Sequence, residues 1–222
     1  MSPPRTYVFD AYGTLFDVHS AAAKHKDAIG PVWDRMSQAW RTKHLEYTWI
    51  HAQTGRMTTF WTLTERSLDY AIASVGGIPA GTRAKLLEAY RVLDAYPEVA
   101  EVLAGLRAKG AKLAILSNGD PDMLESAVGS AGLGPLLDAV ISVSEAGIFK
   151  PAASVYALAT RRFGVAPAEV SFQSSNRWDI AGAKVFGCRC VWINRMAAPD
   201  EYPDMAPDAV TRDLRPLLAD AA

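Results

Sequence analysis

Short apolar runs alternate with helical patterns along most of this chain, and the alternation indicates its fold class. Each apolar run is short enough to be one buried strand, and the runs lie at residues 6–9, 112–116, 139–143, 170–173 and 190–193. Amphipathic helical spacing separates them at residues 97–110, 154–163 and 178–186. Such alternation predicts an α/β fold with a Rossmann-like parallel sheet that helices cover on both faces.

The stretch from residue 18 to residue 96 departs from this rhythm. It shows no strand pattern, and its apolar residues recur at helical spacing, first at Trp33, Met36, Trp40 and Tyr47 and then at Phe60, Leu63 and Leu68. An all-helical block after the first strand of an α/β domain indicates a cap over a core. We therefore expect a helical cap domain over residues 18–96, inserted into a discontinuous core domain formed by residues 1–17 and 97–222.

Composition and charge narrow the classes of function. The chain has 222 residues, 23 Lys and Arg against 24 Asp and Glu, and a formal net charge of -1. A nearly neutral protein has no strong field for a nucleic-acid backbone or an anionic membrane surface. No apolar run approaches the roughly 18 residues of a membrane span, and residues 1–5 are not followed by a signal-type apolar segment. We expect a cytoplasmic globular protein that binds neither nucleic acid nor membranes.

The cysteines and histidines show no metal-binding pattern. Cys188 and Cys190 are two residues apart in a strand-like segment and are the only cysteines, so two reduced thiols explain them better than a disulfide or a zinc site. The four histidines lie at no ligand spacing with cysteines or carboxylates, and we expect them to be solvated; they are His19, His25, His44 and His51.

Polar residues that could carry chemistry follow the ends of the predicted strands. In open parallel sheets, the carboxyl ends of the strands lie at one edge, where ligands bind. The residues at such positions are Asp10, Ser117, Asn118, Lys150, Ser174, Asn176 and Asp179. Each one alone could be a turn former or a solvated side chain. A carboxylate, an ammonium group and two hydroxyl or amide clusters at one edge together predict an active site.

These residues fall in four ordered motifs that resemble those of the haloacid dehalogenase superfamily. The motifs are Asp10-Ala-Tyr-Gly-Thr-Leu-Phe-Asp17, Ser117-Asn118-Gly119, Lys150-Pro151 and Ser174-Ser-Asn-Arg-Trp-Asp179. The resemblance covers the whole chain, with the helical insertion in the position of that family's cap. Within the superfamily the chain is most similar to the (S)-2-haloacid dehalogenases of type II, which implies hydrolysis of small-molecule 2-haloacids.

Two positions favour a dehalogenase over the magnesium-dependent phosphatases that make up most of the superfamily. The first motif of the phosphatases resembles Asp-x-Asp, and Tyr12 stands at the position of their second aspartate. The run 174–176 also lacks the acidic residue that their fourth motif usually carries. A hard dication needs several charged oxygen ligands, whereas a halide leaves without an acid or a metal. We expect no cofactor and no metal. A small-molecule phosphatase is the alternative enzyme, and a non-enzymatic binding protein would be expected to have lost Asp10 or Lys150.

The resemblance implies roles for the charged residues. Asp10 attacks C2 of the substrate and forms an ester, a covalent route that divides one difficult step into two. Lys150 keeps Asp10 ionised, and Thr14 hydrogen-bonds the same carboxylate. Asp179 is either the base that activates water for ester hydrolysis, with Ser174 and Asn176 as orienting partners, or a structural partner of Lys150.

The resemblance also implies a set of substrate-binding residues. Ser117 would bind the substrate carboxylate, and Arg41 and Asn118 would bind the halide. Tyr12, Phe60 and Trp178 resemble the family's apolar pocket wall, although both Phe60 and Trp178 are equally explained as core residues. Tyr156 resembles an active-site residue or is an ordinary helix-packing residue.

Arg41 can be interpreted in two ways. It shares a helix face with Leu45 and Trp49, and an arginine on such a stripe usually extends from the stripe's edge toward water. On a cap helix whose apolar face points at the core, however, the guanidinium would lie in the cleft between the domains. Members of the family are commonly homodimers, so we expect a homodimer here too.

Overall fold

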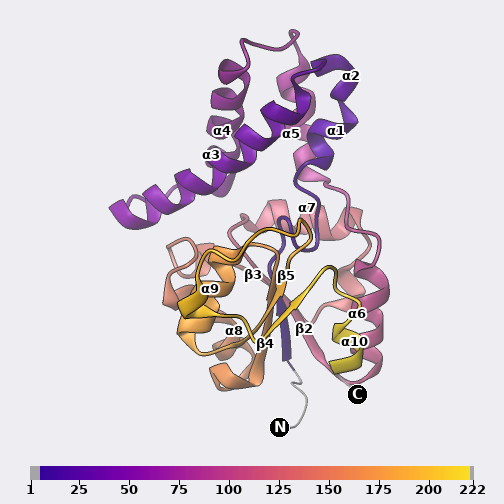
Figure 1. Cartoon of the computed structure of the whole chain (residues 1–222), viewed down its shortest axis with the longest axis vertical. Coiled ribbons are helices and arrows are strands. Elements are labelled where there is room, and N and C mark those ends of the chain that lie inside the picture. The colour runs from indigo at the N-terminus through magenta and orange to yellow at the C-terminus, as the bar shows by residue number, and fades with distance from the viewer. Residues whose placement is uncertain (1–5, 221–222) are drawn as a thin grey trace.

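A parallel sheet lies at the centre of the larger lobe of the molecule (Figure 1). The computed structural model describes residues 6–220, so the start of the chain at 1–5, where no leader is expected, lies outside the described residues. Within 6–220 the sheet has six strands in the order β3-β2-β1-β4-β5-β6, all parallel. The strands are β1 Thr6–Phe9, β2 Lys112–Ser117, β3 Ala139–Ser142, β4 Val170–Ser174, β5 Arg189–Ile193 and β6 Ala209–Thr211.

The five strands predicted from apolar runs are confirmed, each to within one residue. The central strand β1 is buried on both faces, with Tyr7, Val8 and Phe9 fully inaccessible to solvent. The edge strand β6 escapes prediction because it has only three residues and leaves Val210 56% exposed, so no apolar run marks it. The α/β, Rossmann-like fold expected from the sequence is therefore confirmed, with one further edge strand.

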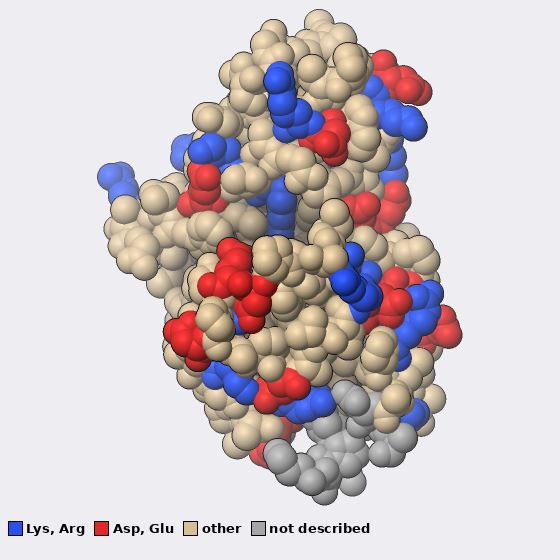
Figure 2. Space-filling view, in the orientation of Figure 1, with Lys and Arg blue, Asp and Glu red and all other residues tan. Residues whose placement is uncertain are grey.

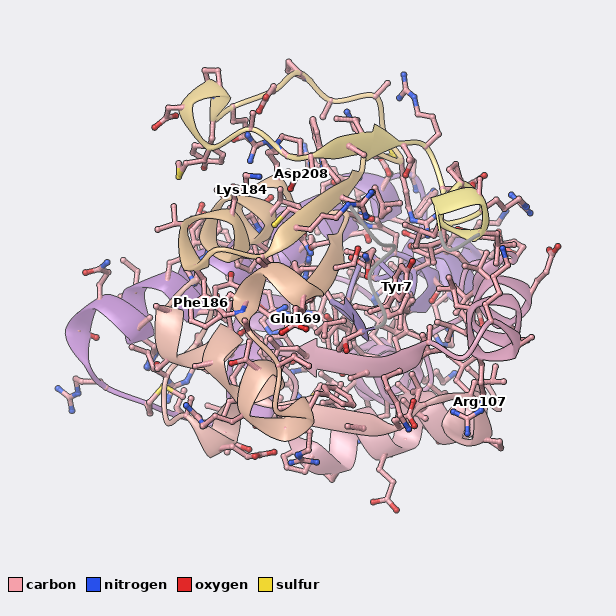
Figure 3. The ribbon with its side chains drawn as sticks, turned by 90° about the horizontal axis from the view of Figure 1, so that it is seen from below. Tyr7, Arg107, Glu169, Lys184, Phe186 and Asp208 are labelled. Atoms are coloured by element: carbon pink, nitrogen blue, oxygen red, sulfur yellow. The ribbon has the colours of Figure 1, made fainter. Side chains whose placement is uncertain are left out.

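Helices cover both faces of the sheet. In Figure 1, α8 and α9 lie on one side, and α6 and α10 lie on the other. Their bounds are α6 Val99–Ala108, α7 Pro121–Ser130, α8 Ala153–Phe163, α9 Arg177–Phe186 and α10 Leu217–Asp220. Short 3₁₀ turns connect them at Gly134–Leu136, Val143–Glu145, Pro167–Glu169 and Pro203–Met205. Lys184 and Asp208, labelled in Figure 3, form a 2.7 Å ion pair that connects α9 to the segment before β6.

The segment between β1 and α6 forms the smaller, helical lobe (Figure 1). Its five helices, all within the described residues, are α1 Ser20–Lys24, α2 Lys26–Ile29, α3 Trp33–Thr54, α4 Phe60–Ser74 and α5 Thr82–Arg91. The buried residues of α3 and α4 include Met36, Trp40, Leu63 and Leu68, which accounts for the helical spacing in the sequence. Between residues 6 and 220, no helix is both long and apolar enough to cross a membrane.

Two connecting segments join the lobes and pair with each other. Phe16 forms an antiparallel bridge with Ala95, and the amide of Asp17 donates a hydrogen bond to Asp94 O at 2.8 Å. We propose that the domain boundaries lie at this pairing, which leaves residues 18–96 as the cap and residues 1–17 and 97–222 as the core.

The arrangement fixes where a site can form. All strands are parallel, and their carboxyl ends face the helical lobe (Figure 1). Figure 2 shows acidic and basic side chains interspersed over the visible face, as the near-zero net charge leads one to expect. Polar residues that follow the strand ends therefore meet the cap helices rather than open water.

Candidate active site

Asp10 follows the end of β1, and four donors hold its carboxylate. Its Oδ2 accepts hydrogen bonds from Asn176 Nδ2 at 2.8 Å, Thr14 Oγ1 at 3.0 Å and, at the longer distance of 3.5 Å, Ser174 Oγ. Its Oδ1 accepts one hydrogen bond, from Lys150 Nζ at 3.1 Å. Asp10 is only 5% exposed. The donors orient a charged carboxylate, and Oδ1 is the oxygen with the fewer contacts.

Lys150 lies between two carboxylates in the interior. Its side chain is 1% exposed, and Nζ is 3.1 Å from Asp10 Oδ1 and 2.8 Å from Asp179 Oδ2. Burial by itself would lower the pKa of Lys150, but the charges of Asp10 and Asp179 outweigh burial and raise that pKa above its ordinary value. The ammonium therefore stays charged between the two carboxylates.

Asp179 has both carboxylate oxygens occupied. Oδ2 accepts from Lys150, and Oδ1 accepts from the Tyr156 hydroxyl at 2.8 Å. Burial, with a contribution from the charge of Asp10, raises the pKa of Asp179 to about 6, although Lys150 acts in the opposite direction. Burial also raises the pKa of Tyr156 well above its usual range, so its phenol remains a donor. Tyr156 thus contacts the charged cluster and does more than pack against its neighbours.

Arg41 reaches from α3 across to the core. Its Nη2 donates to Asn176 Oδ1 at 2.8 Å and to Tyr12 O at 3.0 Å. The guanidinium therefore lies where the lobes meet and does not extend from the apolar stripe into solvent. Asn176 donates from Nδ2 to Asp10 and accepts at Oδ1 from Arg41, so one amide side chain joins the cap arginine to the core carboxylate.

The loop after β2 lies against Lys150. Asn118 Oδ1 accepts a hydrogen bond from the Lys150 amide at 3.0 Å, and Ser117 Oγ accepts one from the Gly119 amide at 3.1 Å. Ser117 is fully buried and Asn118 is 7% exposed. A Cβ atom at Gly119 would lie 2.8 Å from the Tyr12 ring, so this loop packs tightly beneath the Asp10 loop. The structure thus brings Ser117 and Asn118 to the same edge as Asp10 and Lys150.

Aromatic side chains surround the polar residues. The Phe60 ring is 2% exposed, and its centroid lies 5.4 Å from that of Tyr12 and 6.4 Å from that of Phe149. Trp178 meets Trp49 of α3 edge to face at 5.6 Å, and its buried indole nitrogen has no hydrogen-bond partner among the described residues. Phe60 and Trp178 therefore bring cap and core together as apolar neighbours of the site.

His44 is buried in this region, so the expectation that it is solvated is wrong. It is 1% exposed, and its ring nitrogens lie 3.2 Å from Thr64 Oγ1 and 3.4 Å from the Tyr90 hydroxyl. Burial, together with the charge of Arg41, lowers the pKa of His44 to about 3. The imidazole is therefore neutral and packs against Phe60 at 4.1 Å. Its place four residues after Trp40, on the helix face that also carries Met36, is a sequence signal that could have revealed it.

The donor set at the site does not suit a divalent cation. Among residues 6–220 no group of three or more His, Cys, Asp and Glu side chains could hold a metal ion. The Lys150 ammonium bonds both Asp10 and Asp179, and so a dication would have to displace it. Burial raises the pKa of Tyr12 well above its usual range, so this phenol is a much weaker acid than an aspartate at this position would be. Cys188 and Cys190 are free and buried.

Comparisons with known proteins identify the family. A model of haloacid dehalogenase-like hydrolases matches residues 4–187. The chain is 46% identical to (S)-2-haloacid dehalogenase 1 of Pseudomonas sp. (strain CBS-3), over 91% of this chain and 89% of that protein. It is 42% identical to (S)-2-haloacid dehalogenase 4A of Burkholderia cepacia, over 89% of this chain and 86% of that protein.

A solved structure of similar shape extends the comparison. The L-2-haloacid dehalogenase from Xanthobacter autotrophicus, with chloropropionic acid covalently bound, matches at a TM-score of 0.89 with 39% identity, over 97% of each chain. The resemblance of the four motifs is thus confirmed over nearly the whole chain. The protein belongs to the haloacid dehalogenase-like hydrolases and, within them, to the (S)-2-haloacid dehalogenases.

Proposed function

We propose that this protein converts (S)-2-haloalkanoic acids to (R)-2-hydroxyalkanoic acids and halide through an ester of Asp10. The observation that carries the proposal is the buried Asp10 carboxylate, oriented by donors on Oδ2 and accompanied on Oδ1 by Lys150. An ionised carboxylate at a water-poor strand end is a competent nucleophile. The (S)-2-haloacid dehalogenases to which the chain is 46% and 42% identical support the substrate class.

The first step forms the ester. An Asp10 oxygen attacks C2 from the side opposite the halogen, the carbon–halogen bond breaks, and the electron pair leaves with the halide. Ser117 binds the substrate carboxylate, and Lys150 offsets the repulsion between this carboxylate and that of Asp10. Arg41 and Asn118 stabilise the departing halide, whose charge grows during the step. The single displacement inverts C2.

The second step hydrolyses the ester. Asp179 accepts a proton from a water molecule that attacks the carbonyl carbon of the Asp10 ester, and Ser174 and Asn176 orient the reacting groups. The ester's carbonyl–oxygen bond breaks, and the departing oxygen takes up the proton that Asp179 holds, which frees the (R)-2-hydroxy acid. Asp10 then loses its own proton to solvent and is a carboxylate again. Because attack occurs at the carbonyl carbon, the configuration at C2 does not change again. Thr14 holds the carboxylate in both steps.

Apolar residues set the shape of the pocket. Tyr12, Phe60 and Trp178 line the side of the substrate away from its carboxylate, where the alkyl group and halogen lie. Tyr156 keeps Asp179 in place through its hydroxyl. Apolar rings on this side of the nucleophile also limit competing attack by water before the halide has left.

The proposal includes a homodimeric assembly and a cytoplasmic location. Ile50 and Met57 are 61% and 38% exposed at the end of α3 and just beyond it, and Tyr70 of α4 is 46% exposed. These apolar side chains support a homodimer formed through the helical lobe. The two free thiols of Cys188 and Cys190 suit the reducing conditions of the cytoplasm, where we place the protein.

A chelation assay tests the proposed function. We expect halide release from (S)-2-chloropropionate to be unchanged after exhaustive treatment with EDTA, because Lys150 rather than a metal balances the charges of Asp10 and Asp179. The (R)-enantiomer is the matched control and should release little halide. Loss of turnover with EDTA and recovery with Mg²⁺, accompanied by hydrolysis of p-nitrophenyl phosphate, would instead identify a phosphatase.

The raised pKa of Asp179 predicts a dependence of kcat on pH. A base must be deprotonated to act, so the activity that depends on Asp179 is present above its pKa and is lost below it. That pKa is about 6 in the free enzyme. In the ester Asp10 is neutral and no longer raises it, but burial, the larger cause, remains, so we expect kcat to fall about tenfold per pH unit from a point between about pH 4 and pH 6. A kcat that stays level to about pH 4, the ordinary range of aspartate, would contradict this assignment.

The variant Asp179→Asn separates the two roles of Asp179. If Asp179 is the hydrolytic base, the variant forms the ester but cannot cleave it. We then expect one equivalent of halide per enzyme in a burst, followed by almost no turnover. If Asp179 only supports Lys150, ester formation slows as well, and the burst disappears along with turnover.

A further inference from the structure

The N-terminus of cap helix α4 is capped by a residue of the core. Asp120 Oδ1 accepts a hydrogen bond from the Phe60 amide at 3.0 Å, and Oδ2 accepts one from the Trp61 amide at 2.7 Å. The third amide of the helix, that of Thr62, bonds to Thr59 Oγ1 at 3.1 Å. The first amides of a helix have no partner within it. The first two amides of α4 thus find their partner across the junction between the lobes.

Asp120 does not serve the helix that it precedes. It is the N-cap residue of α7, with φ -66° and ψ 155°, yet its side chain makes no capping hydrogen bond to that helix. Aspartate at an N-cap ordinarily bonds the amides of its own helix. Here the carboxylate points at α4 instead, where its charge also interacts favourably with the positive end of a 15-residue helix.

The position of Asp120 links two sides of the site. Toward the core, it follows the loop of Ser117 and Asn118, and Asn118 Oδ1 accepts from the Lys150 amide. Toward the cap, it holds the amide of Phe60, whose ring is buried against Tyr12. A shift of the α4 terminus would therefore move the apolar wall relative to the loop that binds the substrate carboxylate.

We propose that Asp120 is a positioning residue, a latch that holds the N-terminus of α4 and Phe60 over the Ser117–Asn118 loop and so favours the closed arrangement of the lobes. The expected effect of Asp120 on substrate binding rests on the proposed function. The contact between Asp120 and α4 does not depend on that function. Asp120 acts through α4. A neighbouring contact, in which Arg91 stacks on Trp61 at 4.0 Å and pairs with Asp122 at 3.0 Å, is exposed and contributes less.

Steady-state kinetics of Asp120→Ala test the latch. If substrate binds only to the closed lobes, the apparent affinity falls in proportion to the closed fraction, while the chemical steps after binding are unchanged. We expect KM for (S)-2-chloropropionate to rise about tenfold with kcat within about threefold of wild type. Asp120→Asn should raise KM less, because an amide oxygen still accepts one of the two hydrogen bonds. Glu125→Gln removes one charge from an exposed position of the same helix and should leave KM unchanged.

Hydrogen exchange tests the contact without any turnover. The amides of Phe60 and Trp61 should exchange faster in Asp120→Ala than in wild type, and those of Glu125→Gln should match wild type. If the wild-type protein released no halide, the proposed function would fail, and exchange would still decide whether the latch exists. If Asp120→Ala fails to fold, Asp120→Asn supplies both measurements.

Three results overturn the latch. The first is exchange of the Phe60 and Trp61 amides that is no faster in Asp120→Ala than in wild type, because the contact would then not hold the helix terminus. The second is a KM unchanged in the folded Asp120 variants. The third is an equal rise of KM in Glu125→Gln, since that would trace the effect to the charge of α7 alone.

Discussion

Replacement of Asp10 by asparagine is expected to reduce halide release from (S)-2-chloropropionate by at least about ten-thousandfold. The amide is nearly the same size, and its one oxygen can still accept either the hydrogen bond from Lys150 or those from Thr14 and Asn176, so the fold should persist. It is, however, a very poor nucleophile, and without the ester no second step exists. Asp10→Ala serves as a second variant, because it cannot regain a carboxylate by deamidation. The measurement is halide release under saturating substrate.

Isotope labelling shows whether the loss reflects nucleophilic attack. Asp10 could instead deprotonate a water molecule that attacks C2, and both routes invert C2. In the covalent route the new hydroxyl oxygen comes from Asp10, and solvent oxygen enters the Asp10 carboxylate during hydrolysis. With wild-type enzyme in excess and one turnover in H₂¹⁸O, we expect the label in the peptide that contains Asp10 and not in the hydroxy acid.

The opposite distribution of label would contradict the covalent route. Label in the hydroxy acid after the first turnover, with an unlabelled Asp10 peptide, would make Asp10 a general base. Geometry favours attack, because Lys150 and the donors on Oδ2 hold the carboxylate in a fixed orientation. A covalent ester also gives Asp179 its separate task.

Much of the fold and of the site could be predicted from the sequence because both depend on local signals. A buried parallel strand needs a short continuous apolar run, and β1 supplies one that stops at Asp10. Since carboxyl ends of parallel strands meet at one edge, Asp10, Ser117 and Ser174 had to converge once the strands were recognised. Lys150 does not directly follow a strand. Its place in the ordered motifs, rather than the spacing of apolar residues, predicts it as a site residue.

The remaining features depend on contacts between distant segments, which periodicity cannot reveal. Tyr156 is a helix residue with an apolar ring, and only the fold shows that its hydroxyl reaches Asp179. His44 is polar by type but is enclosed where α3 packs on α4. Asp120 looks like an ordinary N-cap of α7, and its bonds to α4 span 60 residues of sequence. In each case the partner, rather than the residue type, defines the role.

Replacement of Arg41 by lysine is expected to lower kcat by about a hundredfold, with a smaller change in KM. A halide gains negative charge as the bond to C2 breaks, so a group that stabilises it acts mainly in the transition state. The structure adds a reason why lysine cannot substitute. Arg41 Nη2 already donates to both Asn176 Oδ1 and Tyr12 O.

The shape of the guanidinium explains how one residue can do both tasks. It carries five N–H donors in a rigid planar fork, so it can keep the two core contacts and still present donors to the halide. A lysine ammonium has its three donors on one atom at the end of a flexible stem, so it cannot spread them over the separate positions that the guanidinium nitrogens occupy. If it moves toward the halide, it weakens its bond to Asn176, which also holds Asp10 Oδ2.

A matched control separates this effect from a general loss of arginine. Arg35 lies exposed on the same helix, α3, and Arg35→Lys should leave kcat and KM unchanged. A kcat and a KM both near those of wild type in Arg41→Lys would show that Arg41 only packs the two lobes together. A large rise in KM at constant kcat would place its action in substrate binding rather than in halide departure, because uniform binding lowers KM without accelerating the chemical step.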